Sequence, residues 1–275
     1  MLTPNTQGTQ PETFTARRAS RLALLAAAAA LFGCAPPEHV VLVHGAWQGA
    51  WALGPVATQL RYDGTKVSVV ELPAHGADQT PVSAATLDAY VNKVGESVDA
   101  EGQPVVLVGH SMAGMVISQY AERNPAKVKS LVYLAAYLPA DGQSLQDLAY
   151  TDGDSHLGPA LVVNASEGTG TIPQDKLQDV FCADCSASTL DSLKSNYRDE
   201  PLAPIGTPVS LTAAAWGSVP KSYVFTTQDN AVSYALQQRM AGAVTLRGSA
   251  TLETSHSPFL SAPSKVVDAL QQLIR

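Results

Sequence analysis

Residues 104–116 read PVVLVGHSMAGMV, a short apolar run that breaks into a turn of small residues and then restarts as an amphipathic segment. The run Val105–Val108 predicts a strand buried on both faces, as in a parallel sheet covered by helices. Apolar residues beyond the turn recur at helical spacing, namely Met112, Val116, Ile117 and Tyr120. We therefore expect Ser111 at a strand-to-helix corner, with its hydroxyl beside the backbone N–H of Met112 and the positive end of the helix.

Serine is also favoured as a helix cap, and Ser111 could serve that role alone. A cap does not require small residues on both sides, whereas Gly109 and Gly114 suit a strained turn at which strand and helix pass closely. The pattern G-x-S-x-G is met except at its last position, where this chain has Ala113. We interpret Ser111 as a catalytic nucleophile.

The rest of the chain alternates between buried-strand patterns and helical patterns. Strands are expected at residues 40–43, 67–72, 105–108, 128–137, 221–227 and 244–246. Amphipathic helices are expected around residues 53–60, 87–98, 112–120, 236–240 and 267–274. This alternation predicts an α/β fold with a mostly parallel, doubly wound sheet.

Residues 139–215 interrupt the alternation. They hold several prolines and two of the three cysteines, show no strong strand pattern, and read as helical near 174–181 and 187–197. An insertion of this length between core strands is best interpreted as a cap over the carboxyl edge of the sheet, forming the roof of a substrate pocket. The core then comprises residues 38–138 and 216–275.

Two polar residues follow late strands in the order that a Ser–Asp–His triad requires. Asp229 comes just after the strand at 221–227, although it could simply cap the next helix. His256 lies in the loop after the last strand, where a histidine is ordinarily just exposed. Because ligand sites form at the carboxyl ends of such strands, we predict Ser111 as nucleophile, His256 as base and Asp229 as acid. Asp141, after an earlier strand, is the competing acid.

The loop after the first strand offers backbone donors. Residues 44–51 read HGAWQGAW, and their glycines leave N–H groups accessible beside the neighbouring strand end. We predict an oxyanion hole formed by the backbone N–H groups of Ala46 and Met112. His44 is interpreted as a structural histidine.

Composition argues against several kinds of partner. The formal net charge is −7, and an acidic surface disfavours nucleic acid or anionic lipid as partners. Cys182 and Cys185 form a C-x-x-C pair, but further zinc ligands at matching spacing are missing from the sequence, so no metal site is predicted. A local disulfide and two buried thiols both remain open for this pair.

The amino terminus has the order of an export signal. Residues 1–16 are polar and are expected to be disordered. Arg17, Arg18 and Arg21 precede an apolar run at 22–32, which is too short for a membrane span of about 20 residues. The sequence LFGC ending at Cys34 resembles a lipobox, with ordinary cleavage near Cys34 and a twin-arginine signal as alternatives. We expect an exported protein, periplasmic or tethered to a membrane through lipidated Cys34.

Six short motifs together resemble the plant hydroxynitrile lyase and methylesterase group of α/β-hydrolases and its bacterial esterase relatives. They are LVHGA at 42–46, VGHSM at 108–112, YLAAYLP at 133–139, DCS at 184–186, GSVPK at 217–221 and TQD at 227–229. The resemblance implies an α/β-hydrolase fold with a helical cap inserted after the sixth core strand. It also implies a cofactor-free enzyme, often a homodimer, that acts on small esters with an apolar or aromatic part.

The resemblance leaves two rivals to an esterase. One is a lyase that cleaves cyanohydrins, and the other is a non-catalytic protein that binds small molecules on the same scaffold. The lyases of the group carry a lysine just after the catalytic histidine and a threonine in the first oxyanion loop. This chain has Ser257 and Ala46 at those positions. We therefore expect acyl transfer to water and not cyanide release.

Overall fold

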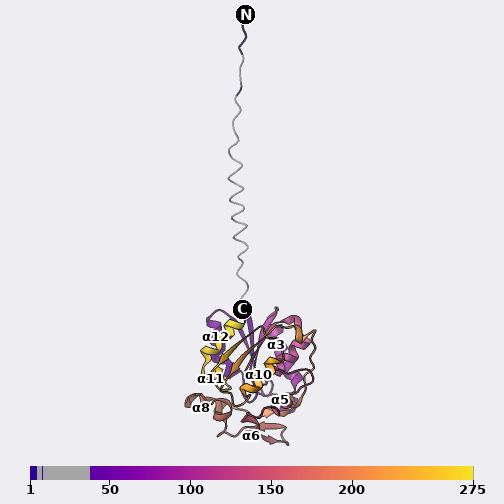
Figure 1. Ribbon diagram of the computed structural model, residues 1–275, viewed down its shortest axis with the longest axis vertical. Helices are drawn as coiled ribbons and strands as arrows, with labels where there is room; N and C mark the ends of the chain where they lie inside the picture. Colours follow the sequence, from indigo (N-terminus) through magenta and orange to yellow (C-terminus); the bar gives the residue numbers. More distant parts are fainter. Residues whose placement is uncertain (5–7, 9–37, 275) are drawn as a thin grey trace. The chain divides into compact units, whose positions relative to one another are not determined.

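The computed structural model describes residues 1–4, 8 and 38–274 (Figure 1). The predicted export signal and Cys34 lie outside the described residues. The chain divides into two units, Met1–Pro36 and Pro37–Arg275, and every described helix and strand belongs to the second. Within the described ranges, no helix has both the length and the apolar character needed to cross a membrane.

A six-stranded parallel sheet forms the centre of the second unit. Along the chain its strands are β1 (His39–Val43), β2 (Lys66–Val70), β3 (Val105–His110), β4 (Val128–Leu134), β8 (Lys221–Thr226) and β9 (Gly248–Leu252). Their order across the sheet is β2-β1-β3-β4-β8-β9, and every neighbouring pair is parallel. The strand order changes direction between β1 and β3, which is the point at which ligand sites form in open α/β sheets.

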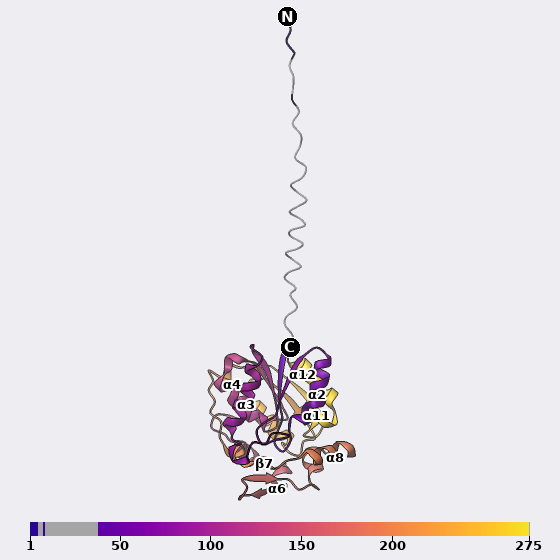
Figure 2. The same cartoon turned by 180° about the vertical axis from the view of Figure 1, so that it is seen from behind.

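Helices cover both faces of this sheet, as the predicted doubly wound fold requires. On one face lie α3 (Leu87–Asp99) and α4 (Ala113–Arg123), and on the other lie α2 (Gly54–Tyr62), α11 (Pro258–Ser261) and α12 (Pro263–Leu273) (Figure 2). Helix α10 (Tyr234–Gly242) connects β8 to β9. Short 3-10 turns occur at η1 (Ala50–Leu53), η2 (Val82–Ala84), η3 (Pro125–Lys127) and η4 (Trp216–Ser218).

The central strands are buried on both faces because successive side chains point to opposite sides. In β1, Val41 and Val43 pack into one hydrophobic core with residues of α3 and α4. Val40 and Leu42 pack into a second core with residues of α2 and α12. The continuous apolar runs of the sequence are thus explained by two separate cores, one on each face of the sheet.

The cap between β4 and β8 differs from the prediction in two respects. It contains the helices α5 (Leu145–Ala149), α6 (Leu157–Ala160), α7 (Leu177–Phe181), α8 (Ala187–Asn196) and α9 (Leu202–Gly206). It also contains a three-stranded antiparallel sheet of β5 (Val162–Asn164), β6 (Thr169–Thr171) and β7 (Glu200–Pro201), so it is not purely helical. Furthermore, among the described residues the cap follows β4, the fourth strand along the chain, and not a sixth strand as the resemblance implied, because only β1 to β4 come before it.

The last strand was also predicted in the wrong place. The apolar residues 244–246 suggested it, but β9 is Gly248–Leu252. This strand lies at the edge of the sheet and is partly exposed, and Leu252 is its one buried residue. An edge strand of this kind needs no continuous apolar run, and its sequence GSATL shows none.

Candidate active site

Ser111 occupies the turn between β3 and α4 with a backbone φ of 54°, a left-handed conformation that is uncommon for a residue with a side chain. Close packing requires both neighbouring glycines. A Cβ atom at Gly114 would lie 1.9 Å from the carbonyl oxygen of Tyr137, and one at Gly109 would lie 2.9 Å from that of Ala113. Ala113 itself is the buried first residue of α4, so the turn accommodates its methyl group. The geometry is that of a strained turn and not of a simple helix cap.

Ser111, His256 and Asp229 form one chain of hydrogen bonds. The Nε2 atom of His256 lies 3.0 Å from Oγ of Ser111, and its Nδ1 atom lies 2.8 Å from Oδ2 of Asp229. Because Nδ1 faces a carboxylate, which only accepts, this nitrogen carries the ring proton. Nε2 is then free to accept the hydroxyl proton of Ser111. All three residues are buried.

Asp229 is held by a dense set of donors. Its Oδ1 atom accepts the backbone N–H groups of Ala231 and Val232, each at 2.9 Å. Its Oδ2 atom accepts the hydroxyl of Thr226 at 2.8 Å and the amide of Gln237 at 3.1 Å. Four donors besides His256 thus satisfy and orient this carboxylate.

Asp229 and Asp141, the two candidate acids, differ in what they contact. Helix α10 is capped by Ser233, whose hydroxyl accepts the N–H of Leu236, so Asp229 is not the cap of that helix. The competing acid, Asp141, accepts the backbone N–H of Leu211 at 2.8 Å and does not contact His256. The geometry therefore pairs His256 with Asp229.

Ser111 opens into a cavity of about 320 Å³ between the core and the cap. Ala46 and Met112 line the same cavity, and in the described structure neither of their backbone N–H groups donates to a protein acceptor. The walls are mainly apolar cap residues, including Leu145, Leu157, Leu161, Val163, Leu202 and Ile205. The lining contains no lysine or arginine, and its one carboxylate, Asp152, accepts hydrogen bonds from Ser233. Such a cavity suits a small neutral molecule.

Trp47, which follows Ala46, is tied to the cap by three hydrogen bonds. Its backbone N–H donates to Oε2 of Glu200 at 2.8 Å, and its indole N–H donates to the carbonyl of Gly170 at 2.8 Å. Its carbonyl accepts the N–H of Arg198 at 3.2 Å. No pattern in the sequence indicates these contacts, because they join residues more than a hundred positions apart.

Glu200 also pairs with His75, and both side chains are fully buried. The Nε2 atom of His75 lies 2.8 Å from Glu200, and its Nδ1 atom lies 2.9 Å from the carbonyl of Pro73. Both ring nitrogens face acceptors, so the imidazole is doubly protonated. Burial lowers the pKa of His75, but the charge and hydrogen bond of Glu200 outweigh burial, and the pKa lies above its ordinary value.

Two other histidines near the site are neutral. Burial lowers the pKa of His44, whose Nδ1 atom donates to Gly45 and whose Nε2 atom accepts the N–H of Leu72 at 3.1 Å. These contacts agree with a structural role for His44. Burial also holds the pKa of His110 well below its usual value, and Nε2 of this ring donates to the carbonyl of His256 at 2.9 Å.

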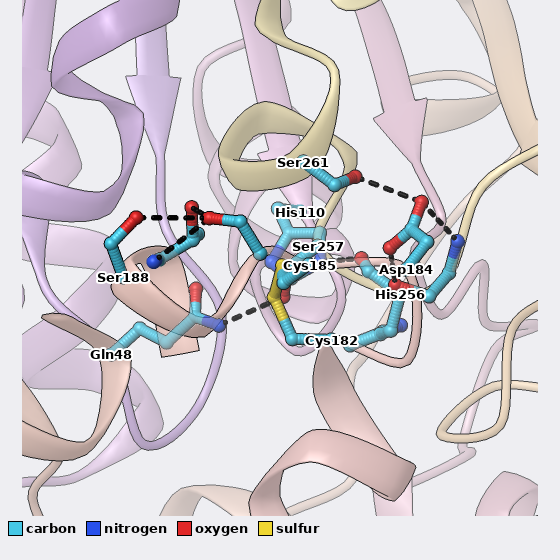
Figure 3. Close-up of a disulfide and its surroundings, with 12 residues drawn as sticks. Gln48, His110, Cys182, Asp184, Cys185, Ser188, His256, Ser257 and Ser261 are labelled. Carbon is cyan, nitrogen blue, oxygen red and sulfur yellow. Dashed lines mark hydrogen bonds between the residues drawn. A yellow bond between two sulfur atoms is a disulfide. The ribbon is translucent and has the colours of Figure 1, made fainter. Parts of the chain in front are cut away.

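The C-x-x-C pair is a disulfide between Cys182 and Cys185, which resolves the alternative that the sequence left open (Figure 3). In the part of the chain that the structure describes, no group of three or more His, Cys, Asp or Glu side chains could hold a metal ion. A second cavity of about 650 Å³ is lined by Asp141, Trp216 and Lys221 among others, but none of Ser111, Asp229 and His256 reaches it.

The sequence profile of the alpha/beta hydrolase family matches residues 40–269. The chain belongs to this family. The fold agrees, because a crystal structure of polyneuridine aldehyde esterase, 23% identical in sequence, superposes with a TM-score of 0.78. That likeness covers 87% of this chain and 100% of the other.

Curated hydrolase-family relatives cover most of this chain. A protein of Arabidopsis thaliana named "Putative methylesterase 11, chloroplastic" is 30% identical over 250 residues, which is 86% of this chain, and this chain spans only 64% of the length of that relative. A pyrethroid hydrolase of Sphingobium wenxiniae is 27% identical over 245 residues, or 84% of this chain and 85% of the relative. An alpha-hydroxynitrile lyase of Arabidopsis thaliana is 27% identical over 249 residues, or 86% and 96%.

Proposed function

We propose that the protein is a carboxylic ester hydrolase that works through an acyl-enzyme on Ser111. The observation that carries this proposal is the hydrogen-bond chain from Asp229 through His256 to Ser111, which itself lines an apolar cavity. Relatives named as a methylesterase and a pyrethroid hydrolase support the same reaction class. The proposal includes the roles of all three residues.

The proposed reaction has two halves. The hydroxyl oxygen of Ser111 attacks the ester carbonyl carbon while its proton passes to Nε2 of His256. The N–H groups of Ala46 and Met112 stabilise the oxyanion, and His256 then returns the proton to the leaving alcohol. In the second half, His256 takes a proton from water, the hydroxide attacks the acyl group, and the acid leaves as the hydroxyl of Ser111 is restored.

The substrate class follows from the lining of the cavity. A volume of about 320 Å³ matches a small ligand, and the walls are mostly aliphatic and aromatic. An anionic substrate would find no lysine or arginine in this lining. We therefore propose small, neutral esters with an apolar or aromatic acyl or alcohol part.

Hydrolysis of p-nitrophenyl acetate by the purified protein tests the reaction class, and a panel of short-chain, long-chain and aromatic esters tests the substrate class. We expect turnover well above the uncatalysed rate, and the fastest turnover with short or aromatic esters. If the purified protein binds esters but hydrolyses none of them, the proposal is wrong and the protein is a binding protein on a hydrolase scaffold.

A second candidate function is cyanohydrin cleavage, because one relative is named an alpha-hydroxynitrile lyase. Ala46 supplies no hydroxyl and Ser257 no cation at the two positions that distinguish the lyases of this group. Ester hydrolysis needs neither group, and we therefore favour it.

We also propose that the protein is exported, from the arginines, the apolar run and Cys34 near its amino terminus. The intact mass of the protein recovered from a Gram-negative host tests this. A diacylglyceryl adduct on Cys34 supports membrane anchoring, and loss of the residues before it without lipid supports simple export. An unprocessed amino terminus contradicts both.

A further inference from the structure

The loop that carries His256 is held by hydrogen bonds at three successive residues, 255–257. The carbonyl of His256 itself accepts from His110 at 2.9 Å. On one side of it, the hydroxyl of Ser257 accepts the amide of Gln48 at 3.1 Å. On the other side, Ser255 is held from the cap by Asp184. The first two contacts come from the core, and only the third comes from the cap.

Asp184 makes this third contact with both carboxylate oxygens. Its Oδ1 atom accepts the hydroxyl of Ser255, and its Oδ2 atom accepts the backbone N–H of Ser255 at 3.2 Å. Oδ2 also accepts the hydroxyl of Ser261 in α11 at 2.9 Å. Hydrogen bonds to an ionised acceptor are shorter and stronger than neutral ones. Although Asp184 is exposed, Ser255 is buried, so the carboxylate reaches from the surface to a buried backbone segment next to His256.

The Cys182–Cys185 disulfide closes the turn that presents Asp184. The backbone N–H of Cys185 donates to the carbonyl of Cys182 at 3.0 Å, and Asp184 lies between the two cysteines. The preceding residue, Phe181, packs its ring 6.0 Å from the ring of His256. The segment 181–185 therefore contacts the histidine through Phe181 and the neighbouring serine through Asp184.

We propose that Asp184 is a positioning residue for His256, and that the disulfide makes this positioning depend on the redox state of Cys182 and Cys185. The inference rests on the proposed function, in which Nε2 of His256 must stay within hydrogen-bond reach of Ser111. A dithiol reductant transfers two electrons and two protons to the S–S bond, giving two thiols and the disulfide of the reductant. The turn then loses its covalent closure, and the carboxylate loses its fixed direction.

This arrangement predicts an effect on kcat and not on KM. Neither Asp184 nor Ser255 lines the substrate cavity, so substrate contacts stay unchanged when the hold on Ser255 is lost. A displacement of about 1 Å at a catalytic group can lower the rate by about 10²-fold. A role limited to overall stability would change the melting temperature without separating kcat from KM.

The first test compares Asp184→Ala with Asp184→Asn, which keeps one acceptor oxygen. Asp191→Ala is the matched control, because Asp191 is an exposed cap carboxylate with no side-chain hydrogen bond in the described structure. We expect Asp184→Ala to lower kcat about ten- to a hundred-fold with KM unchanged. Asp184→Asn should recover part of this loss, and Asp191→Ala should match the wild type. An unchanged kcat in Asp184→Ala overturns the positioning role.

The rate at which a fluorophosphonate labels Ser111 is measured on the same variants, because labelling needs the serine and its histidine but no ester substrate. Slower labelling of Asp184→Ala supports the positioning role even if no ester is turned over, in which case only the proposed function fails. Equal labelling rates in Asp184→Ala and wild type overturn the inference alone. Failure to label the wild-type protein overturns both.

The second test treats the wild-type protein with dithiothreitol and follows intact mass, kcat and labelling together. The double variant Cys182→Ala/Cys185→Ala is the control, because it retains Cys34 and lacks the disulfide. We expect kcat of the wild type to fall toward that of the double variant as the protein gains two hydrogen atoms, and to return on reoxidation. The double variant should not respond to the reductant. A fully reduced wild type with unchanged kcat and labelling overturns the redox dependence.

Discussion

The backbone N–H of Trp47 donates to Glu200 at 2.8 Å, so a fully buried carboxylate of the cap holds the residue next to Ala46. The N–H of Ala46 is one of the two proposed oxyanion donors, and it belongs to the peptide unit directly before that of Trp47. A change in the position of β7 would therefore move the peptide that must meet the oxyanion. The cap covers the cavity and also fixes part of its floor.

Removing the Glu200 carboxylate should destabilise the fold. Glu200→Ala leaves the buried charge of His75 without its partner and the N–H of Trp47 without an acceptor. We expect the free energy of unfolding in urea to fall by about 3–5 kcal/mol. Glu167→Ala, an exposed cap carboxylate, should change it by less than about 0.5 kcal/mol. Equal stability of the two variants would show that the buried pair is not the source of the effect.

The same pair predicts a dependence of stability on pH. The pKa of His75 is raised in the folded protein, so its contribution is fully present below the unfolded value of about 6.5. The contribution is lost as the pH rises through the folded pKa. We therefore expect the gap in unfolding free energy between wild type and Glu200→Gln to shrink as the pH rises above about 6.5. A gap that widens with rising pH would mean that His75 is neutral in the folded state.

The sequence predicts the core well because buried parallel strands carry their own signal. The runs in β1 and β3 have no polar interruption, since both faces of these strands are covered. The edge strand β9 alternates between partly buried and exposed residues, and β5 of the cap is exposed along its whole length. Because exposed strands of this kind need no continuous apolar run, the sequence pattern predicted neither β9 nor β5 at its observed position.

The sequence could predict that Ser111, Asp229 and His256 lie close together, because each follows a strand and the carboxyl ends of these strands lie at one edge of the sheet. Asp184 and Glu200 could not be predicted. Their partners lie 71 and 153 residues away, and the contacts depend on how the cap docks. Asp184 belongs to the DCS motif at 184–186, but neither this motif nor any periodicity of the cap indicates which core residues the cap contacts.

Ser111→Ala should abolish ester hydrolysis. Only one oxygen atom is removed, and the methyl group fits the turn that already holds the serine Cβ, so the fold should be retained. Loss of a serine nucleophile costs about 10⁶-fold in kcat in a well-studied triad. Hydrolysis of p-nitrophenyl acetate and circular dichroism measure the two effects. More than a trace of remaining activity would remove Ser111 from the proposed role.

Asp229→Asn and Asp141→Asn separate the two candidate acids. An asparagine at 229 can donate to Nδ1 of His256 and so favours the wrong tautomer, with an expected loss of about 10⁴-fold in kcat. Asp141 contacts Leu211 and not the histidine, and its variant should stay within a few-fold of wild type. The two kcat values on one ester decide the matter, and the reverse ranking would assign the acid to Asp141.

The last prediction separates a hydrolase from a lyase. Cyanide leaves a cyanohydrin as an anion, and a buried anion without a partner costs several kcal/mol. The cavity is lined by no lysine or arginine, and Ser257, which stands where the lyases carry lysine, is fully buried and bonded to Gln48. An ester needs no such cation, because its oxyanion meets two backbone donors and its alcohol leaves with a proton from His256.

We therefore expect hydrolysis of short or aromatic esters, and no cyanide release from mandelonitrile above the uncatalysed rate. Both assays are run on the same preparation, with Ser111→Ala as the control for reactions that do not use the site. Cyanide release in the wild type that is faster than ester cleavage and absent in Ser111→Ala would overturn the hydrolase assignment. Such a result would also show that a neutral cavity can stabilise the departing anion, through N–H donors such as those of Ala46 and Met112.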